Sequence, residues 1–356
     1  MIKPPALLND WLPGWLRHRF AASQSAWRAR RGPMDHVIVL DGTMSSLREG
    51  EQSNAGLSYL LLREMGRASF YYEAGVQWSG WGKTPDVAMG RGLNWQIRRA
   101  YGWLASRYRA GDRIFLLGYS RGAYAVRSLA GIIERVGLLK ANHATERNIR
   151  QAYRLYQFRG VSRSLQAFQE AHCHTDTRIE MIGVWDTVKA LGMRLPFLWR
   201  LSEAEHAFHS HTLGAHVQAG FHALARDETR VAYSPVLWSC PPEFPGLVEQ
   251  VWFRGTHGDV GGQIGDMTAA RPLANIALVW MLSKLEAREI ALPEGWRDRF
   301  EQDVNAPSIG LWKGVAKLFL LRAPRRIGDD PSESLHESIA PKPRPETTLP
   351  GEEDET

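Results

Sequence analysis

The feature that most constrains the fold is an alternation of short apolar runs with stretches of helical periodicity. Four runs read as buried strands, at 37–40, 113–117, 179–184 and 248–253. Between and after them, apolar residues recur at helical spacing over 94–108, 121–135, 146–171 and 270–288. Strands that are apolar on both faces and joined through helices form parallel sheets covered by helices on both sides. The sequence therefore predicts an α/β fold with a mostly parallel sheet.

Charge separates a long central part of the chain from two ends of opposite sign. The 356 residues carry a net charge of +6, but residues 1–34 hold six Lys or Arg against one Asp. Residues 328–356 are rich in Pro and acidic side chains, a composition typical of a disordered or loosely packed tail. We therefore expect a basic, Trp- and Arg-rich arm (1–34), one central domain (35–327) and an acidic tail (328–356).

Composition excludes several classes of function. Two cysteines, Cys173 and Cys240, are too few for a disulfide framework or a cysteine-built zinc site. The central part is nearly balanced in charge and shows no basic stripe with interleaved aromatic residues, so nucleic acid is not an expected partner. The chain also lacks a secretory signal pattern and an apolar run of roughly 18 residues that could cross a bilayer. We expect a cytoplasmic protein.

Two segments with Trp, Leu and basic residues, 7–20 and 311–322, suit the interface of a membrane. Peripheral membrane contact is therefore one expectation, and packing of both segments on the core is the other. A third segment holds four histidines, His206, His209, His211 and His216. Metal binding would require facing geometry and usually a carboxylate or thiolate partner, so we expect a partly helical lid there, and neither a metal nor a cofactor.

The stretch 114–123, IFLLGYSRGA, places Ser120 between two glycines where an apolar run meets a helical pattern. In a small-x-Ser-x-small turn between strand and helix, the serine hydroxyl is exposed and the flanking glycines leave room for neighbouring chain. The helix that follows directs its first amides towards the serine, where they can stabilise an oxyanion. Ser120 is thus a candidate nucleophile; the alternative is a capping serine in a phosphate-type turn.

Five blocks of sequence together resemble one family. They are LDGT at 40–43, GYSRGAY at 118–124, GVWDTV at 183–188, HALARDE at 222–228 and VWFRGTHGDVGG at 251–262. In this order, over about 37–340, they are similar to the α/β-hydrolase family that includes the catalytic domain of type VI secretion phospholipase effectors. The resemblance implies a Ser-Asp-His α/β-hydrolase acting on esters, phospholipids among them. We expect one α/β-hydrolase domain with a mostly helical insertion between the strands of the second half of the sheet.

Two aspartates are candidates for the acid of such a triad. Asp259 lies in a Gly-rich turn just beyond the run that ends at 253, at a strand's carboxyl end, where ligands gather in open α/β sheets. Asp186 follows the run ending at 184 and is the rival. We prefer Asp259 and assign Asp186 a supporting role near the nucleophile's loop. A turn aspartate that caps local amides is the alternative for Asp259.

Two histidines are candidates for the base. His336 resembles the family's terminal His-x-Ser block and is preferred, although a solvated histidine of the acidic tail is the alternative. His257 competes with it; a position two residues from Asp259 does not by itself guarantee the geometry of a relay.

An oxyanion formed on the substrate would be held by the amide of Arg121, the residue after the nucleophile, together with an amide of Gly42 or Thr43. We therefore expect a serine esterase that acts through an acyl-enzyme, with lipid or phospholipid esters as the leading substrate class. The alternatives are a soluble hydrolase of small esters or thioesters, and an inactive membrane-associated binding protein with the same fold.

Overall fold

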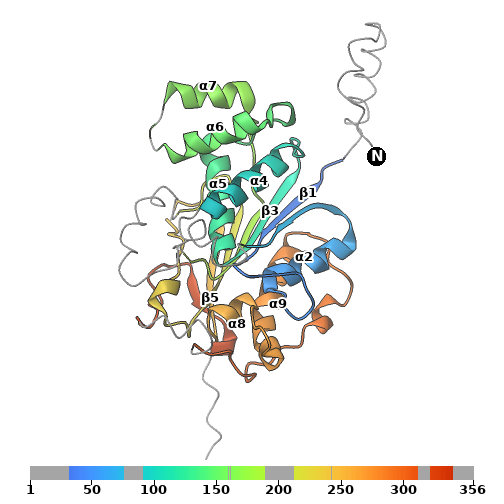
Figure 1. Cartoon of the computed structure of the whole chain (residues 1–356), viewed down its shortest axis with the longest axis vertical. Helices are drawn as coiled ribbons and strands as arrows, with labels where there is room; N and C mark the ends of the chain where they lie inside the picture. Colours follow the sequence, from blue (N-terminus) through green and yellow to red (C-terminus); the bar gives the residue numbers. More distant parts are fainter. Residues whose placement is uncertain are drawn as a thin grey trace, which may run out of the picture.

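The computed structural model describes residues 32–75, 91–158, 160, 162–188, 212–241, 243–311 and 321–339. Its centre is a parallel sheet in the order β2-β1-β3-β4-β5-β6-β7 (Figure 1). The strands are β1 (Asp35–Leu40), β2 (Ala68–Glu73), β3 (Arg113–Tyr119), β4 (Met181–Trp185), β5 (Ala219–Ala225), β6 (Leu247–Phe253) and β7 (Glu333–Leu335). The predicted α/β fold is confirmed.

Helices cover both faces of the sheet (Figure 1). On one face lie α4 (Arg91–Ala105) and α5 (Arg121–Val136), with α6 (Glu146–Gln157) and α7 (Arg163–His172) outside them, and on the other lie α2 (Asn54–Met65) and α9 (Arg271–Ala287). The short helix α8 (His257–Gly261) follows β6. Single 3-10 turns are formed by Ala141–His143, Val231–Tyr233, Thr268–Ala270, Trp296–Arg299 and Glu337–Ile339.

Successive side chains of the central strands enter opposite cores, which explains why the strands read as continuous apolar runs. In β1, Ile38 and Leu40 join the cluster under α4 and α5, whereas Val37 and Val39 join the cluster under α2 and α9. Because side chains alternate along a strand, a strand buried on both faces must be apolar at every position. The two cores therefore fix the position of the strands and of the loops that follow them.

The helical pattern over 146–171 predicts one helix, but the structure contains two, α6 and α7. Each begins at a residue whose hydroxyl caps the first turn: Thr145 accepts from the amide of Asn148, and Ser162 accepts from the amide of Leu165. Gly160 lies between the two helices. Glycine is unfavourable within a helix, and the hydroxyl of Ser162 favours the start of a new one. The spacing of apolar residues over 146–171 does not reveal this break.

Three strands and one long helix lie outside the predicted runs: β2, β5, β7 and α2. Strand β7 lies in the region that composition assigns to a loosely packed tail, yet it pairs in parallel with the edge strand β6. The indole of Trp252 donates to the carboxylate of Glu333 across this pair. An unpaired edge strand offers a row of backbone donors and acceptors, so a short polar segment can join it without an apolar pattern of its own.

Several sequence-based expectations fall outside the described residues: the arm up to residue 31, the histidines at 206, 209 and 211, most of 311–322, and the tail from 340. The helical insertion was expected between later strands; residues 189–211, between β4 and β5, are outside the described part, and α6 and α7 precede β4. Within the described ranges no helix has the length and apolarity needed to cross a membrane.

Candidate active site

Ser120 occupies the turn between β3 and α5 in a conformation that few non-glycine residues adopt. Its φ is 58° and its ψ is −118°. The flanking glycines are sterically required: a Cβ on Gly118 would lie 2.7 Å from the Cα of Ala123, and a Cβ on Gly122 would lie 2.0 Å from the carbonyl oxygen of Leu40. The turn therefore presents the Ser120 hydroxyl at the end of the strand, as in a nucleophile elbow.

A hydrogen-bonded relay connects Ser120 to a histidine and an aspartate. Oγ of Ser120 lies 2.9 Å from Nε2 of His257, and Nδ1 of His257 lies 2.6 Å from Oδ2 of Asp186. All three residues are buried. Because a carboxylate can only accept, a neutral His257 carries its proton at Nδ1 and accepts the serine proton at Nε2. The arrangement can remove the proton from the serine hydroxyl.

The parallel sheet explains why these residues meet. Ser120 follows β3, Asp186 follows β4, and His257 begins α8 shortly after β6, so all three lie at the carboxyl edge of the sheet. This edge is where open α/β sheets build their sites. Asp186, with a φ of 41°, is held there by hydrogen bonds from its own amide to the carbonyl of Ala223 and from the amide of Ala225 to its Oδ1.

Two aromatic rings fix the orientation of the imidazole. The ring of Tyr119 stacks on His257 at a centroid distance of 5.0 Å, and the ring of Tyr233 meets it edge-on at 4.9 Å. The amide of His257 donates to the buried carboxylate of Glu228, which is paired with Arg230. With these contacts, the ring lies with Nδ1 towards Asp186 and Nε2 towards Ser120.

Asp186 is kept ionised by its surroundings. Burial alone would raise the pKa of this carboxyl, but the charge of Arg325 and the hydrogen bonds from His257 and Arg325 outweigh burial and hold the pKa well below its usual range. The acid is thus charged across the neutral range and can stabilise a protonated His257.

The structure does not bring Asp259 to Ser120. Its Oδ2 accepts from the amide and hydroxyl of Thr256 at 2.8 Å each and from the hydroxyl of Ser308 at 2.5 Å, while its Oδ1 accepts from the amide of Ile309 at 2.9 Å. These contacts cap α8, the helix that carries His257. The preference for Asp259 as the acid is therefore not met; its place in the structure is the alternative, a turn aspartate that caps local amides.

His336 is also remote from the relay. It lies just beyond β7, where its ring stacks on Phe253 at a centroid distance of 4.5 Å and its Nδ1 accepts from the amide of Ser338. Its own amide donates to the carbonyl of Trp252 and extends the pairing of β7 with β6. The rival histidine, His257, takes the position beside the nucleophile because the short helix α8 turns back over the carboxyl edge of the sheet.

The loop after β1 lies beside the turn that carries Ser120. It contains Gly42 and Thr43, the two residues whose amides are candidates for the second oxyanion donor. The amide of Gly42 donates to Oδ1 of Asp41 at 2.7 Å, so this group is already engaged. Thr43 is bound to the nucleophile turn, because its hydroxyl accepts from the guanidinium of Arg121. Of the two expected loop donors, the amide of Gly42 is thus engaged within its own loop, and the expectation of an oxyanion donor passes to Thr43.

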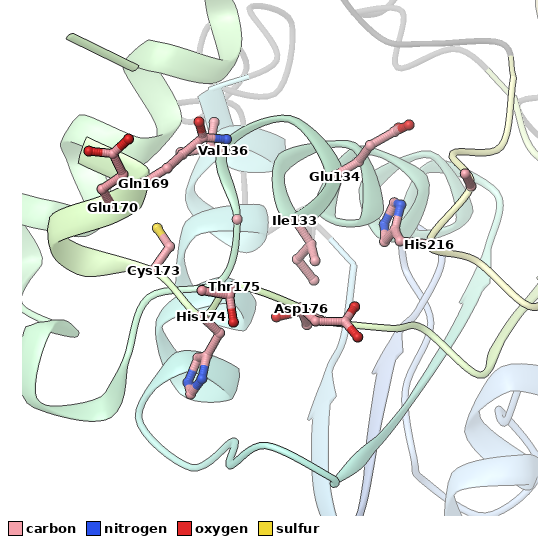
Figure 2. A pocket seen from close by; sticks show the side chains of 13 residues that line it. Ile133, Glu134, Val136, Gln169, Glu170, Cys173, His174, Thr175, Asp176 and His216 are labelled. Carbon is pink, nitrogen blue, oxygen red and sulfur yellow. The ribbon is translucent and has the colours of Figure 1, made fainter. Parts of the chain in front are cut away.

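A cavity of about 530 Å³ lies at the opposite edge of the sheet (Figure 2). Its lining comes from the ends of α5 and α7, the segment before β4 and the segment before β5, and includes Cys173, His174 and His216. Burial raises the pKa of the Cys173 thiol to about 11, which keeps it protonated. Among the described residues, no group of three or more His, Cys, Asp or Glu is arranged to hold a metal ion. The relay of Ser120, His257 and Asp186 lies at the other edge of the sheet, the carboxyl edge.

Sequence reasoning missed Arg325, which contacts both oxygens of Asp186. It is one of three arginines between the central domain and the acidic end, at 322, 325 and 326. Nothing in its local pattern distinguishes it from a solvated charge. Arg325 can be identified as a partner of Asp186 only from the structure, in which the segment after 321 lies at the carboxyl edge of the sheet.

Comparison with known proteins finds one curated protein and two solved structures to which this chain is similar. An uncharacterized protein of Saccharomyces cerevisiae is 25% identical over 240 residues, which are 59% of this chain and 33% of the yeast protein. A solved structure of an uncharacterized protein from Pseudomonas aeruginosa matches with a TM-score of 0.42 and 14% identity, over 79% of this chain and 50% of that one. The Tle1 effector bound to the VgrG spike matches with a TM-score of 0.33 and 17% identity, over 65% and 51% of the two chains.

The chain thus spans about a third of the length of the yeast relative and about half of each solved structure. The family model described as the catalytic domain of Tle1-like phospholipase effectors of the type VI secretion system matches residues 35–284. This match covers more than half of the chain, includes Ser120, Asp186 and His257, and agrees with the resemblance seen in the sequence. The chain belongs to the family of Tle1-like phospholipase effector catalytic domains.

Proposed function

We propose that this protein is a serine hydrolase that cleaves carboxylic esters of lipids or phospholipids through an acyl-enzyme. The observation that carries the proposal is the relay from Ser120 through His257 to Asp186, at 2.9 and 2.6 Å, with the serine in a strained strand-to-helix turn. The lipid class is supported by the family, whose description names phospholipase effectors.

In the first half of the reaction, Nε2 of His257 takes the proton of the Ser120 hydroxyl while Oγ attacks the ester carbonyl carbon. The tetrahedral oxyanion accepts hydrogen bonds from the amides of Arg121 and Thr43. Asp186 stabilises the protonated imidazole. His257 then gives its proton to the departing alcohol, and the acyl group remains on Ser120.

In the second half, His257 removes a proton from a water molecule that attacks the acyl-enzyme. The oxyanion forms again, the bond to Oγ breaks, and His257 returns the proton to Ser120. The products are the alcohol and the carboxylic acid, and no group beyond the chain and water takes part in these steps.

Labelling with a fluorophosphonate probe tests the chemistry directly. We expect one covalent adduct per chain, and the labelled peptide should contain Ser120, because the probe phosphonylates an activated serine. A protein whose denatured and native forms react equally slowly would contradict the proposal. Comparing hydrolysis of a short-chain phospholipid below and above its critical micelle concentration then tests the lipid class; a rate that does not rise with micelles would favour a soluble small-ester or thioester hydrolase.

Substitution of the two aspartates separates their roles. We expect Asp186→Asn to lower kcat by about 10⁴, because an amide at this position no longer stabilises the imidazolium and favours the wrong tautomer. Asp259→Asn should keep kcat within about tenfold per folded molecule and lower the free energy of unfolding by about 1–2 kcal/mol, because it weakens the cap of α8. Steady-state hydrolysis of a nitrophenyl ester and thermal unfolding measure both effects. The opposite ranking of kcat would assign the acid to Asp259.

A further inference from the structure

The acid of the relay has a second charged partner, which the mechanism above does not require. Nη1 of Arg325 lies 2.6 Å from Oδ1 of Asp186, and Nη2 lies 2.9 Å from Oδ2. The Arg325 side chain is 4% exposed and that of Asp186 is fully buried. A guanidinium that meets both oxygens of a carboxylate restricts its rotation as well as balancing its charge.

Arg325 is itself held in place by the backbone around it. Its two terminal nitrogens also donate to the carbonyl of Ala225 at 2.7 Å and to the carbonyl of Tyr233 at 2.5 Å. The chain just before it pairs with the segment that leads to Tyr233: the amide of Val231 donates to Leu321, and the amide of Ala323 donates to Thr229. This short ladder fixes the direction from which Arg325 approaches Asp186.

The groups that face Asp186 come from four parts of the fold. They are Tyr119 at the end of β3, His222 on β5, His257 on α8, and Arg325 on the segment after 321. Burial and the nearby charge of Arg127 lower the pKa of His222 to about 3, and burial raises the pKa of Tyr119 well above its usual range. Both are uncharged at neutral pH. When His257 is neutral, Arg325 is the cation that balances the buried carboxylate within this set of four.

We propose that Arg325 is a positioning residue of the active site, whose guanidinium holds the Asp186 carboxylate charged and aligned towards His257. Arg325 thereby becomes part of the catalytic machinery, although it lies outside the residues 35–284 that the family model matches. This inference rests on the proposed function, since an orientation of Asp186 has catalytic meaning only if His257 is the base.

The sign of the expected pH effect follows from the charge. A positive group beside the Asp186–His257 pair disfavours an added proton on either partner, so removing it must make the pair easier to protonate. Without Arg325, burial of Asp186 is opposed by His257 alone among these groups, so the pKa of this carboxyl should rise. Activity requires the unprotonated pair, and it should therefore be lost at a higher pH as the solution is acidified.

The experiment compares Arg325→Gln, Arg325→Lys and Arg326→Gln in the full chain, with a short-chain nitrophenyl ester as substrate. For Arg325→Gln we expect kcat to fall roughly 100-fold at neutral pH, less than for loss of the acid itself, with the acidic limb of kcat shifted upward by about one pH unit. KM should be nearly unchanged because Arg325 does not touch the substrate. Arg325→Lys keeps the positive charge but cannot contact both carboxylate oxygens of Asp186 as the planar guanidinium does. The acidic limb of its kcat profile should therefore stay in place while kcat falls about tenfold.

Arg326→Gln is the matched control. It removes the same charge from the next residue in the chain, whose side chain is exposed. Its profile should follow that of the unchanged protein. A folded Arg325→Gln protein with unchanged kcat and an unchanged acidic limb would overturn the inference. So would an upward shift of the limb in Arg325→Lys, which remains testable if the glutamine variant does not fold. If the unchanged protein fails to react with the fluorophosphonate, the proposed function fails instead.

Discussion

Replacing Ser120 with alanine is expected to lower ester turnover by about 10⁵- to 10⁶-fold, because only binding and the oxyanion amides then act on the substrate. The turn, the two cores and the relay from His257 to Asp186 do not depend on the hydroxyl. The fold should therefore persist. Steady-state hydrolysis of a nitrophenyl ester measures the loss, and circular dichroism measures the fold.

Ser128→Ala is a suitable control for this substitution. Ser128 lies on α5, the helix that Ser120 begins, and its hydroxyl donates to the carbonyl of Tyr124 within the helix. Its loss should leave turnover almost unchanged. Substantial residual turnover in a folded Ser120→Ala protein would show that another group carries out the attack, and the serine-hydrolase proposal would then be abandoned.

His257→Gln should cause a loss of similar size, about 10⁵-fold or more, because nothing then accepts the serine proton. The matched variant is His336→Gln, which changes the same residue type at the other candidate position. His336 stacks on Phe253 and binds a local amide, so this substitution should cost about 1 kcal/mol of stability and leave kcat near its original value.

The pair of variants is read by kcat on the same ester, with the melting temperature of each protein recorded beside it. If His336→Gln abolished turnover in a folded protein while His257→Gln retained it, the base would be His336, and the relay would have no catalytic role.

The candidate nucleophile Ser120 could be proposed from sequence because the features that point to it are local. An apolar run, two glycines around Ser120 and a helical pattern all lie within a few residues, and the steric reasons for Gly118 and Gly122 act over the same short stretch. The parallel sheet was predictable for a similar reason, since two-sided burial leaves continuous apolar runs. Both predictions depend on neighbours in the chain.

Which aspartate and histidine lie beside Ser120 depends on the loops that the strand order brings together. No single stretch of the sequence determines this order. Asp186 follows β4, the strand next to β3, and so reaches the nucleophile's own turn. From the sequence alone, this nearness favours a supporting role for Asp186. A Gly-rich turn made Asp259 look like a ligand site, whereas its hydrogen bonds organise the first turn of α8.

The C-terminal part was misjudged because its order comes from partners distant in sequence. A three-residue strand has no readable periodicity, and Arg325 is distinguished only by the segment that pairs with residues 229–231. Composition alone predicts a loosely packed tail where β7 forms. It contains no information on the edge of β6, with which β7 pairs.

Two of the three relay residues have a positive φ, 58° at Ser120 and 41° at Asp186. For residues with a Cβ, such conformations cost about 1–3 kcal/mol each, and the surrounding packing must supply that energy. The positions to which we assign the chemistry are thus also positions where the backbone conformation lowers the stability of the native state. Because glycine adopts a positive φ without this cost, glycine at either position would remove the strain and the functional side chain together.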